Sequence, residues 1–598
     1  MKHRIALAAM AAALTLAFVP VHAAPAAEQV PAASAPAAKQ QFNTLADDYY
    51  NALARYEPVN ATQNGDNRFD DQLGMSIAPA VRAKQFALYR AYLKRLRAIA
   101  RAQLDRRDRI HYDVLAYELK TALSFEPFPE HLLPLNQMDS MPVTLANFAG
   151  GDASQPIGTV KEYEAYLSRL SQLPAWIDQA IANMREGMAK HVVLPKALVE
   201  SALPQFKKLP SATPEASIYY TAINKLPATF TDADKQRLAA AYKDAITKLN
   251  PALERLAQFV EQDYLPAARS SSGWSALPQG KAWYQAAVAS STTTTMKPEQ
   301  IHAIGLREVA RIQQQFAVLG PKLGYNGPAA GLPVWVSEQP KFYPFKTEDE
   351  VQAVYRKLND VLDTKLPAMF TLVPKAKLDL RLEPELSRAT AADHYTAPAG
   401  DGSRPGVFWS VVNDPAKYGS TGMNTLFLHE GKPGHHFHIA LTQELDQPLF
   451  RKYGGNNAFT EGWALYAETL GKEMGLFDDP AQYFGHLNDE LLRATRLVVD
   501  TGLHAKGWTR EQTIKYMRDT LGYDAVAKSE TERYMAWPGQ ALGYKIGSLK
   551  IVELRQRAQQ ALGDKFSLPK FHEIVLGDGT VPLSLLETKV DRWIAESK

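Results

Sequence analysis

The stretch VFWSVVNDPAKYGSTGMNTLFLHEGKPGHHFH, residues 407–438, joins a short apolar segment to a cluster of histidines. Val407, Trp409 and Val411 occupy alternate positions, a pattern typical of a β-strand. His429 and Glu430 follow after a short connection. The order predicts a strand, a loop and then a helix that carries chemically active side chains.

His429, His435, His436 and His438 fall within ten residues, and Glu430 directly follows the first. A zinc peptidase needs two neutral imidazoles and usually a carboxylate on the metal, with a second carboxylate nearby to take a proton from water. His429 and Glu430 supply one ligand and that base. The cluster therefore predicts a metal centre; the alternative is a solvated, histidine-rich turn in which His438 is a flanking polar residue.

The residue type at position 433 leaves the second histidine ligand open. In the usual H-E-x-x-H motif the second histidine comes one helical turn later, but Pro433 stands there. An undistorted helix turns about 100° per residue, which puts His436 roughly 20° and His435 roughly 120° from His429. Pro433-Gly434 cannot continue an ideal helix, however, and a bulge there could bring His435 round instead.

Helical periodicity dominates outside this stretch. One apolar stripe runs over Leu238, Tyr242, Ile246, Leu249, Leu253, Leu256 and Val260, after Thr231 as an N-cap. Asn250-Pro251 predicts a kink or a break in that helix. A last stripe, from Leu583 to Ile594, predicts a docked C-terminal helix. Strand-like alternation is expected at 283–291, 378–382 and 407–411, which indicates one small sheet in a mainly α protein.

The N-terminus is typical of an exported protein. Lys2 and Arg4 precede an apolar run, and Val21-His22-Ala23 is a small-residue cleavage site. We therefore expect a periplasmic or secreted protein, cleaved after Ala23 and without stable membrane insertion. The chain has no cysteine, so any metal must be held by His, Asp and Glu, and no cysteine can be lipidated.

Charge excludes a nucleic-acid partner. Of 67 basic residues, 65 remain after Lys2 and Arg4 are removed with the signal, against 64 acidic residues. A chain with so small a net charge produces no overall positive electrostatic potential that would attract nucleic acid. We find no G-x-S-x-G, G-x-x-x-x-G-K-[ST] or G-x-G-x-x-G motif, so serine hydrolases, nucleotide hydrolases and dehydrogenases lack a site.

Three segments, HEGKPGHHFH at 429–438, EGWALYAE at 461–468 and RYMAWPGQALGYKIG at 533–547, resemble the bacterial family called domain of unknown function 885. That family is similar to gluzincin metallopeptidases of the thermolysin clan. The resemblance covers most of the mature chain. Matching Gly434-His435 to the Gly-His pair of gluzincin motifs implies His435 as the second ligand, ahead of His436.

The same resemblance implies further site residues. EGWA is similar to the segment that carries the glutamate ligand of gluzincin aminopeptidases, which makes Glu461 the third ligand. Glu468 shares a helix face with Glu461 and is expected to orient a ligand histidine. Tyr534 and Tyr544 are candidates to stabilise the oxyanion, and His504 and Arg533 to contact the transition state or a carboxylate. The competing interpretations are a solvated carboxylate for Glu461, buried structural tyrosines, a packed His504 and an ion-paired Arg533.

These observations predict a two-lobed helical fold like that of metallopeptidases, with a small β-sheet next to the metal-binding helix. We expect a signal peptide at 1–23, an Ala/Pro-rich linker at 24–40, a helical N-terminal lobe at 41–280 and a catalytic lobe at 281–598, both lobes forming one family domain.

The predicted function is hydrolysis of peptides or oligopeptides with one Zn²⁺ per chain, Mn²⁺ or Co²⁺ serving equally well, and Glu430 as general base. The alternatives are a non-catalytic exported protein that binds metal or peptide, and an amidase or esterase with the same site. The oligomeric state does not follow from the sequence.

Overall fold

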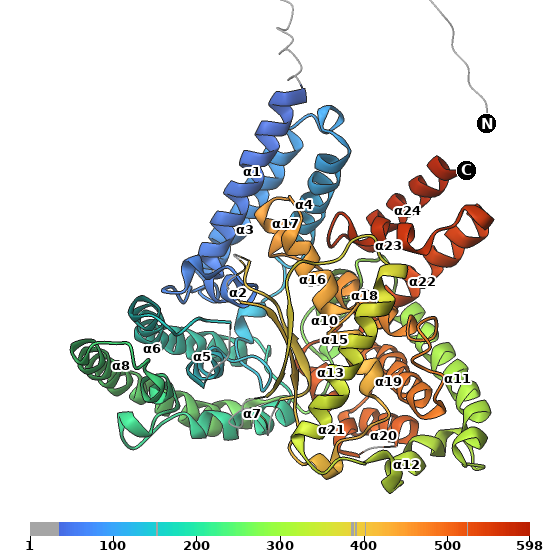
Figure 1. The fold of residues 1–598 in the computed structure, drawn as a ribbon. Coiled ribbons are helices and arrows are strands. Elements are labelled where there is room, and N and C mark those ends of the chain that lie inside the picture. Colours follow the sequence, from blue (N-terminus) through green and yellow to red (C-terminus); the bar gives the residue numbers. More distant parts are fainter. Residues whose placement is uncertain are drawn as a thin grey trace, which may run out of the picture.

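Helices make up most of this protein, whose computed structural model describes residues 35–150, 154–383, 388, 391–400, 402, 404–522 and 524–598 (Figure 1). The mainly α fold is therefore confirmed. The predicted signal peptide lies outside the described residues. The linker predicted at 24–40 ends too late, because helix α1 already begins at Ala35. Alanine has the highest helix propensity, and Pro36 stands in the first turn, where proline is tolerated.

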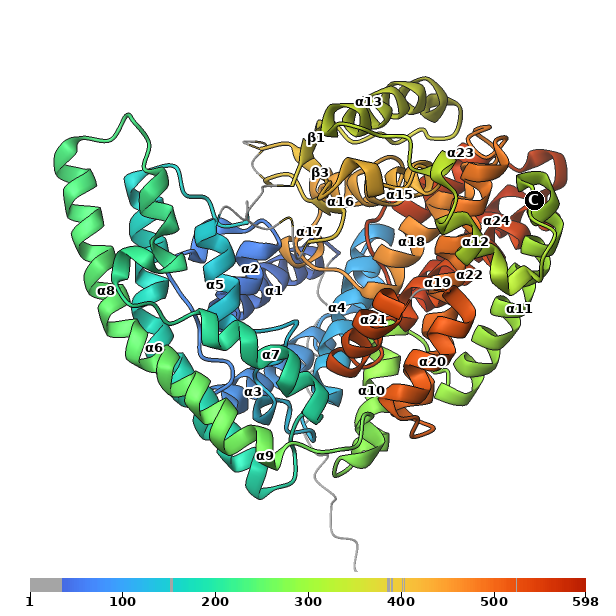
Figure 2. The same ribbon diagram turned by 90° about the horizontal axis from the view of Figure 1, so that it is seen from below.

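The first half of the chain forms two groups of helices (Figure 2). Helices α1–α4 lie near the middle of the molecule, whereas α5–α9 form an arm in which the long helices α6 and α8 pack side by side. The bounds are α1 Ala35–Tyr56, α2 Pro58–Gln63, α3 Pro79–Arg97, α4 Arg106–Ser124, α5 Met141–Gly150, α6 Val160–Ala189, α7 Lys196–Lys208, α8 Asp232–Phe259 and α9 Leu265–Ala267.

The start of α8 confirms one sequence prediction, and its interior excludes the break, though not the kink, predicted at Asn250-Pro251. The Thr231 hydroxyl accepts the backbone N–H of Asp234 at 3.1 Å and so caps α8. The helix does not break at Asn250-Pro251. Leu249, Ala252 and Leu253 are buried around this point, and their packing outweighs the one hydrogen bond that proline removes.

The second half contributes the remaining helices. Helix α11 packs along α19, and α18 packs along α22. The bounds are α10 Gly280–Thr292, α11 Pro298–Leu323, α12 Leu332–Ser337, α13 Glu348–Lys365, α15 Met423–Glu430, α16 His435–Glu444, α17 Leu449–Lys452, α18 Asn457–Thr469, α19 Pro480–His504, α20 Arg510–Leu521, α21 Asp524–Ala536, α22 Leu542–Leu562, α23 Leu568–Leu576 and α24 Leu583–Ser597.

Three strands form one small sheet. They are β1 Leu378–Leu382, β2 His394–Thr396 and β3 Gly406–Ser410, in the order β1-β3-β2. Strand β3 pairs in parallel with β1 and antiparallel with β2. The small sheet and its position ahead of α15 are confirmed. The strand predicted at 283–291 is wrong, because these residues lie in α10, where the buried Trp283, Tyr284, Ala287 and Val288 follow the period of a helix.

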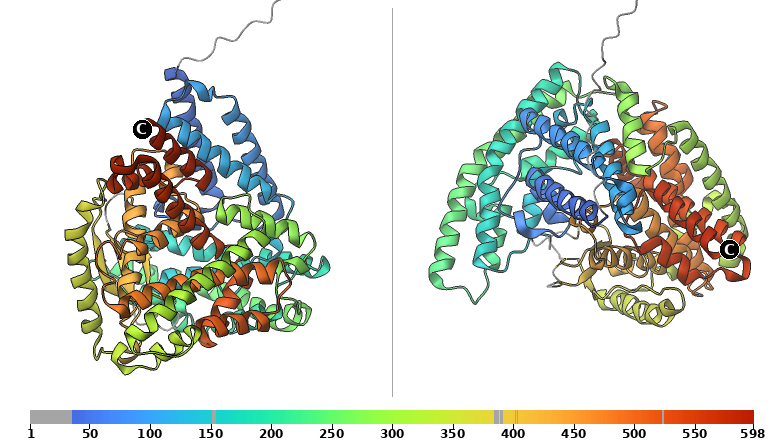
Figure 3. Two further views of the ribbon diagram at one scale, coloured as in Figure 1. Left: turned by 90° about the vertical axis from the view of Figure 1, so that its right-hand side faces the viewer. Right: turned by 90° about the horizontal axis from the view of Figure 1, so that it is seen from above.

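The hydrophobic cores join residues from both sides of residue 280. One core combines α1, α3 and α4 with α13, α15, α18 and α22–α24. The other combines α5–α8 with α11, α19 and α20. The C-terminal helix α24 also lies close to α4 of the first half, since Arg106 at the start of α4 lies 3.6 Å from Glu596 (Figure 3). The predicted division at residue 280 does not separate two cores.

The close crossing of α18 and α22 explains two glycines of the quoted motifs. A Cβ on Gly462 would lie 2.5 Å from the Cα of Gly547, and a Cβ on Gly547 would lie 1.8 Å from the carbonyl oxygen of Ala458. Only glycine permits this approach. Because α18 and α22 cross here, Glu461 of α18 and Tyr544 of α22 lie on two helices that are in direct contact. Among the described residues, none of the helices has the length and apolar character that a membrane crossing requires.

Candidate metal centre

The helix that carries His429 ends at the next residue. Helix α15 stops at Glu430, and α16 begins at His435 after a connection of four residues. Gly434 lies against the end of α15, where an added Cβ would stand 1.9 Å from the carbonyl oxygen of His429. Glycine is therefore required, and the chain turns back so that His435 faces His429. The break replaces the ideal helical geometry that favoured His436.

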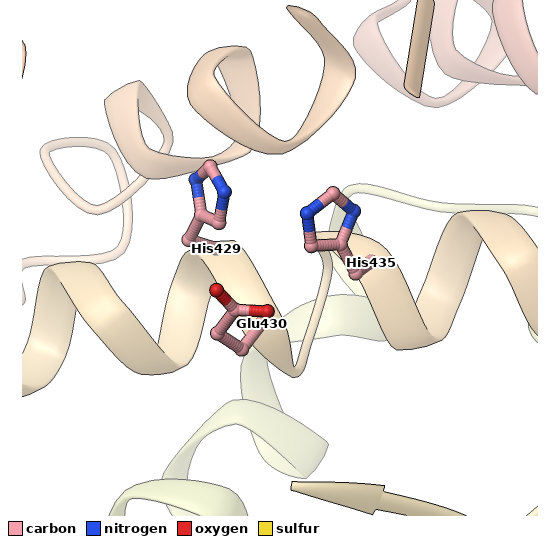
Figure 4. Close-up of side chains that lie close together, drawn as sticks. All are labelled: His429, Glu430 and His435. Atoms are coloured by element: carbon pink, nitrogen blue, oxygen red, sulfur yellow. The ribbon is translucent and has the colours of Figure 1, made fainter. Parts of the chain in front are cut away.

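His429, Glu430 and His435 form a compact group (Figure 4). One ligand atom from each lies within 4.8 Å of the others. The two imidazole rings are 4.8 Å apart between centroids and almost perpendicular, at 86°. Both histidines are buried, and Glu430 is partly exposed. The three side chains thus surround one point from two sides of the helix break.

Glu461 reaches the same point from α18. Its Oε2 atom lies 3.3 Å from Nε2 of His435 and 3.6 Å from Nε2 of His429. This oxygen is buried and makes no hydrogen bond that meets standard geometry with any residue that the structure describes. Asn456 caps α18 by accepting the N–H of Phe459 at 2.9 Å, which fixes where the helix begins and hence where Glu461 points. The structure therefore brings together two imidazoles and one carboxylate that lie far apart in the sequence.

Behind His429 lies a fully buried carboxylate. His429 donates from Nδ1 to Oε1 of Glu468 at 2.7 Å. The bond fixes the orientation of the His429 ring and leaves Nε2 directed at the cluster. The other oxygen of Glu468 lies 3.7 Å from Nδ1 of His486, which stacks on Phe477. His486 thus lies against Glu468 on the side away from the cluster.

The electrostatics of the cluster reflect this crowding of opposite charges. Burial lowers the pKa of His429, but its contacts with Glu461 and Glu468 outweigh burial and raise the pKa to about 10. Burial opposes ionisation of Glu461, yet the charge of His435 and the contact with His429 hold the pKa of Glu461 well below its usual range. Opposite charges on His429 and Glu461 therefore stabilise each other across the cluster.

The other two histidines of the cluster point elsewhere. His436 shares a hydrogen bond of 3.1 Å between its Nδ1 and the Tyr395 hydroxyl, and it also bonds to the backbone of Ala376. Burial lowers the pKa of His436 to about 4. His438 contacts the Thr580 hydroxyl through Nε2 at 3.1 Å. Of the two candidates for second ligand, His435 alone joins the group around His429.

His504 and Tyr534 hold structural positions. His504 accepts the N–H of Trp274 at Nδ1 and donates from Nε2 to the carbonyl of Tyr534, both at 3.0 Å. The Tyr534 hydroxyl donates to Glu530 and accepts from Arg496. Both side chains are buried, and their polar atoms are engaged. These hydrogen bonds are made with residues outside the metal cluster, and the catalytic roles of both side chains remain predictions.

Tyr544 in α22 and Arg533 in α21 contact each other. Arg533 donates to the Tyr544 hydroxyl at 3.2 Å. Burial raises the pKa of Tyr544, and the negative charge of Glu461 raises it further. The guanidinium of Arg496 lies over the Tyr544 ring, 4.7 Å from its centroid. Tyr544 is therefore the predicted tyrosine whose environment includes the metal cluster.

Asp393 is a nearby acid that sequence reasoning missed. It accepts the N–H of Val411 at 2.7 Å and the hydroxyl of Tyr418 at 3.2 Å. Burial raises the pKa of Asp393 to about 6, and the charge of Glu430 contributes to the rise. Asp393 follows residues of no regular pattern, so no periodicity or motif in the sequence marks it.

A large cavity adjoins the cluster. It has a volume of about 1430 Å³ and includes Glu461 and His438 in its wall. Strand β2, helices α1, α2 and α4 and the segment 452–457 form other parts of the wall. A pocket of this size accommodates an extended ligand of several residues.

The comparisons with known proteins agree with the fold. Residues 58–590 match the family described as "Bacterial protein of unknown function (DUF885)". This chain belongs to the DUF885 family. No curated protein matches it.

Two solved structures are similar to this DUF885 member. One is described as a "putative lipoprotein" from Colwellia psychrerythraea, with 31% identity, a TM-score of 0.86, and coverage of 94% of this chain and 99% of that one. The other, a "putative lipoprotein of unknown function" from Shewanella oneidensis, has 20% identity, a TM-score of 0.71 and coverage of 92% and 99%. At 20% identity the likeness concerns the fold. These descriptions assign no activity.

Proposed function

We propose that this protein is a zinc-dependent peptidase of the cell envelope. One observation carries the proposal: His429, His435 and Glu461 converge beside Glu430, and Glu461 also lines a large cavity. A protein that only stores metal or binds peptide needs no carboxylate base next to a ligand. Two imidazoles and a carboxylate beside a second carboxylate are the arrangement that a hydrolytic metal site requires.

The donor set suits Zn²⁺. Two imidazoles and one carboxylate are the ligands of many catalytic zinc sites, which keep a fourth position open. The Nε2 atom of His429 is free because Nδ1 bonds to Glu468, and the buried Oε2 of Glu461 lacks a hydrogen bond that a cation would replace. A bound Zn²⁺ supplies Lewis acidity and makes water a nucleophile near neutral pH. Mn²⁺ and Co²⁺ also accept these donors.

Proton transfer, stabilisation of the developing negative charge and orientation of the His429 ring are carried out by side chains of this protein. Glu430 takes a proton from the attacking water and passes it to the amine that leaves when the peptide C–N bond breaks. The Tyr544 hydroxyl, held by Arg533, donates to the oxygen on which negative charge develops. Glu468 keeps the His429 ring in its orientation throughout.

Strand β2 offers a means to hold an extended peptide. Strand β3 is not available for this purpose, because it is paired on both sides, with β1 and with β2. Strand β2 is at the edge of the sheet, and its residues His394, Tyr395 and Thr396 line the cavity. A peptide that adds to the β2 edge would gain main-chain hydrogen bonds that do not depend on its side chains.

The predicted envelope location accords with the relatives that are described as lipoproteins. We propose a periplasmic or secreted protein that is exported through the predicted signal peptide.

Mass-spectrometric profiling of a mixed peptide library tests the function. The purified mature chain is stripped with a chelator and then reloaded with Zn²⁺, and cleavage is recorded in each state. We expect cleavage by the reloaded protein, none by the stripped protein, and one zinc per chain by elemental analysis. If the zinc-loaded protein leaves every peptide intact, the proposed function is wrong.

A further inference from the structure

The walls of the large cavity carry more carboxylates than basic groups. The acidic residues that line it are Glu57, Glu118, Glu383 and Glu461, and the basic ones are Lys208 and Lys452. Lys208 is exposed at the rim. The excess of negative charge favours a ligand that carries positive charge.

Three of these carboxylates already have partners. Glu57 accepts the amide of Gln85 at 2.6 Å. Glu383 lies 3.9 Å from Nε2 of His394. Glu461 belongs to the candidate metal centre.

Glu118, on α4, differs from these three. It makes no hydrogen bond or ion pair with any residue in the described part of the chain. Its carboxylate lies at the cavity wall beside Gly454, where an added Cβ would be 3.8 Å from Oε1. A carboxylate buried at the cavity wall loses water of hydration, and without a hydrogen-bond partner it regains none of that free energy.

The nearest positive charge does not satisfy Glu118. Arg451 attracts it, but the two terminal nitrogens of Arg451 donate to the backbone carbonyls of Asp578 and Thr580. Burial raises the pKa of Glu118 to about 8, and Arg451 offsets only part of this rise. The site is therefore one where an added cation would gain both a hydrogen bond and a charge partner.

Glu118 is linked to the metal cluster by a continuous wall. The segment from Gly454 to Asn457 lines the cavity beside Glu118 and leads into α18, where Thr460 and Glu461 line it as well. A peptide held at the centre would run along this wall. We propose that Glu118 binds a cationic group of the peptide substrate, an α-ammonium group or the side chain of lysine or arginine, and thereby selects substrates. This inference rests on the proposed peptidase function.

Matched peptides test the assignment and identify the source of the charge. One series carries a free amino terminus and no basic side chain, a second is the same series N-acetylated, a third is N-acetylated with one lysine, and a fourth has norleucine in place of that lysine. The kcat/KM values are measured for zinc-loaded wild type, Glu118→Gln and Glu126→Gln. Glu126 is the control, because it is an exposed glutamate just after α4 whose ion pair with Arg90 is also exposed.

We expect the wild type to prefer either the free amine or the lysine peptide over its uncharged partner by about 10- to 100-fold, the scale of one charged hydrogen bond. Glu118→Gln loses this preference, and Glu126→Gln keeps it. The preferred series tells whether the amino terminus or the basic side chain is bound. An equal preference in wild type and Glu118→Gln would overturn the role of Glu118 and leave the peptidase function intact.

Two further readouts separate the possible failures. Binding of the same peptides is measured by calorimetry in the Glu430→Gln background, with and without Glu118→Gln. Binding that depends on Glu118, without cleavage by the zinc-loaded wild type, would overturn the peptidase function and retain the cation site. The Glu118→Gln variant should unfold at or above the unfolding temperature of the wild type, because it removes an unpaired carboxylate. A fall of several degrees in the unfolding temperature would mean that Glu118 is structural and would overturn the proposal.

Discussion

His429 donates a hydrogen bond of 2.7 Å from Nδ1 to Oε1 of Glu468, a carboxylate that is completely buried. The bond holds the ring so that Nε2 faces His435 and Glu461 across the cluster. An imidazole that was free to rotate would lose this alignment.

Replacing Glu468 by Gln should therefore weaken zinc binding by about 10- to 100-fold, since the amide keeps the shape but not the charge. Competition with a chromogenic chelator measures the affinity. Glu473→Gln is a suitable control, because Glu473 pairs with Arg555 at the surface and should leave the affinity unchanged. Equal zinc affinity of Glu468→Gln and wild type would contradict the role of Glu468.

Glu430→Gln should bind one zinc per chain and lose peptide cleavage. The amide occupies the same space beside His429 but cannot accept the proton, so kcat should fall by about 10²- to 10⁴-fold. Elemental analysis and the rate on a peptide identified by the library scan check both halves of the prediction. Cleavage at the wild-type rate would remove Glu430 from the mechanism.

His435→Ala and His436→Ala should differ in metal content. His435→Ala removes an imidazole from the cluster and should retain far less than one zinc per chain. His436→Ala breaks the contact with Tyr395, so it should keep zinc and unfold at a lower temperature. The opposite pattern, with zinc lost only from His436→Ala, would make His436 the ligand.

Parts of the fold were predictable because they depend on local pattern. The cap at Thr231, the C-terminal helix α24 and strands β1 and β3 follow from periodicity and turn residues. Strand β2 has three residues, too few to alternate visibly. At 283–291 the large buried residues of a helix give a pattern that resembles the alternation of a strand. At Pro251 the packing of buried neighbours keeps the helix continuous, although proline disfavours the interior of a helix.

The site was predictable where a residue type narrows the chemistry. His429, Glu430, His435 and Glu461 stand in motifs whose spacing suits metal ligation, and the structure brings them together. Which of His435 and His436 faces His429 depends on how the chain turns at Gly434. That turn is set by the close approach of Gly434 to the carbonyl of His429, which the sequence spacing does not reveal. Tyrosine and histidine are frequent core residues, so the engaged polar atoms of Tyr534 and His504 could not be foreseen.

Substitution of Tyr544 and of Tyr534 should have different effects on kcat and on stability. Tyr544→Phe removes the hydroxyl that Arg533 contacts beside the cluster, and we expect kcat to fall by about 10²-fold with little change in unfolding temperature. Tyr534→Phe removes the contacts with Glu530 and Arg496, so it should lower stability by about 1–3 kcal/mol and leave kcat near the wild-type value. Steady-state kinetics and denaturant unfolding measure the two effects. Equal loss of kcat in both variants would contradict the assignment of Tyr544.

Acid should destabilise the protein through histidines that are buried in the neutral form. Burial lowers the pKa of His111, His504 and His572 to about 3, against about 6.5 for an exposed histidine. Because the folded pKa is depressed, the unfolded chain binds more protons between pH 6.5 and 3. The free energy of unfolding is then unaffected by these groups above pH 6.5 and falls by about 1.4 kcal/mol per pH unit for each histidine below it.

His504→Gln isolates one of these contributions. A glutamine side chain can accept the N–H of Trp274 and donate to the carbonyl of Tyr534, as His504 does, but it does not titrate. Chemical denaturation of the metal-free wild type and variant between pH 4 and 6.5 should give a slope against pH that is smaller in the variant by about 1.4 kcal/mol per unit. Parallel slopes would show that His504 has the same pKa in the folded and unfolded chain, and burial would then have no effect on its ionisation.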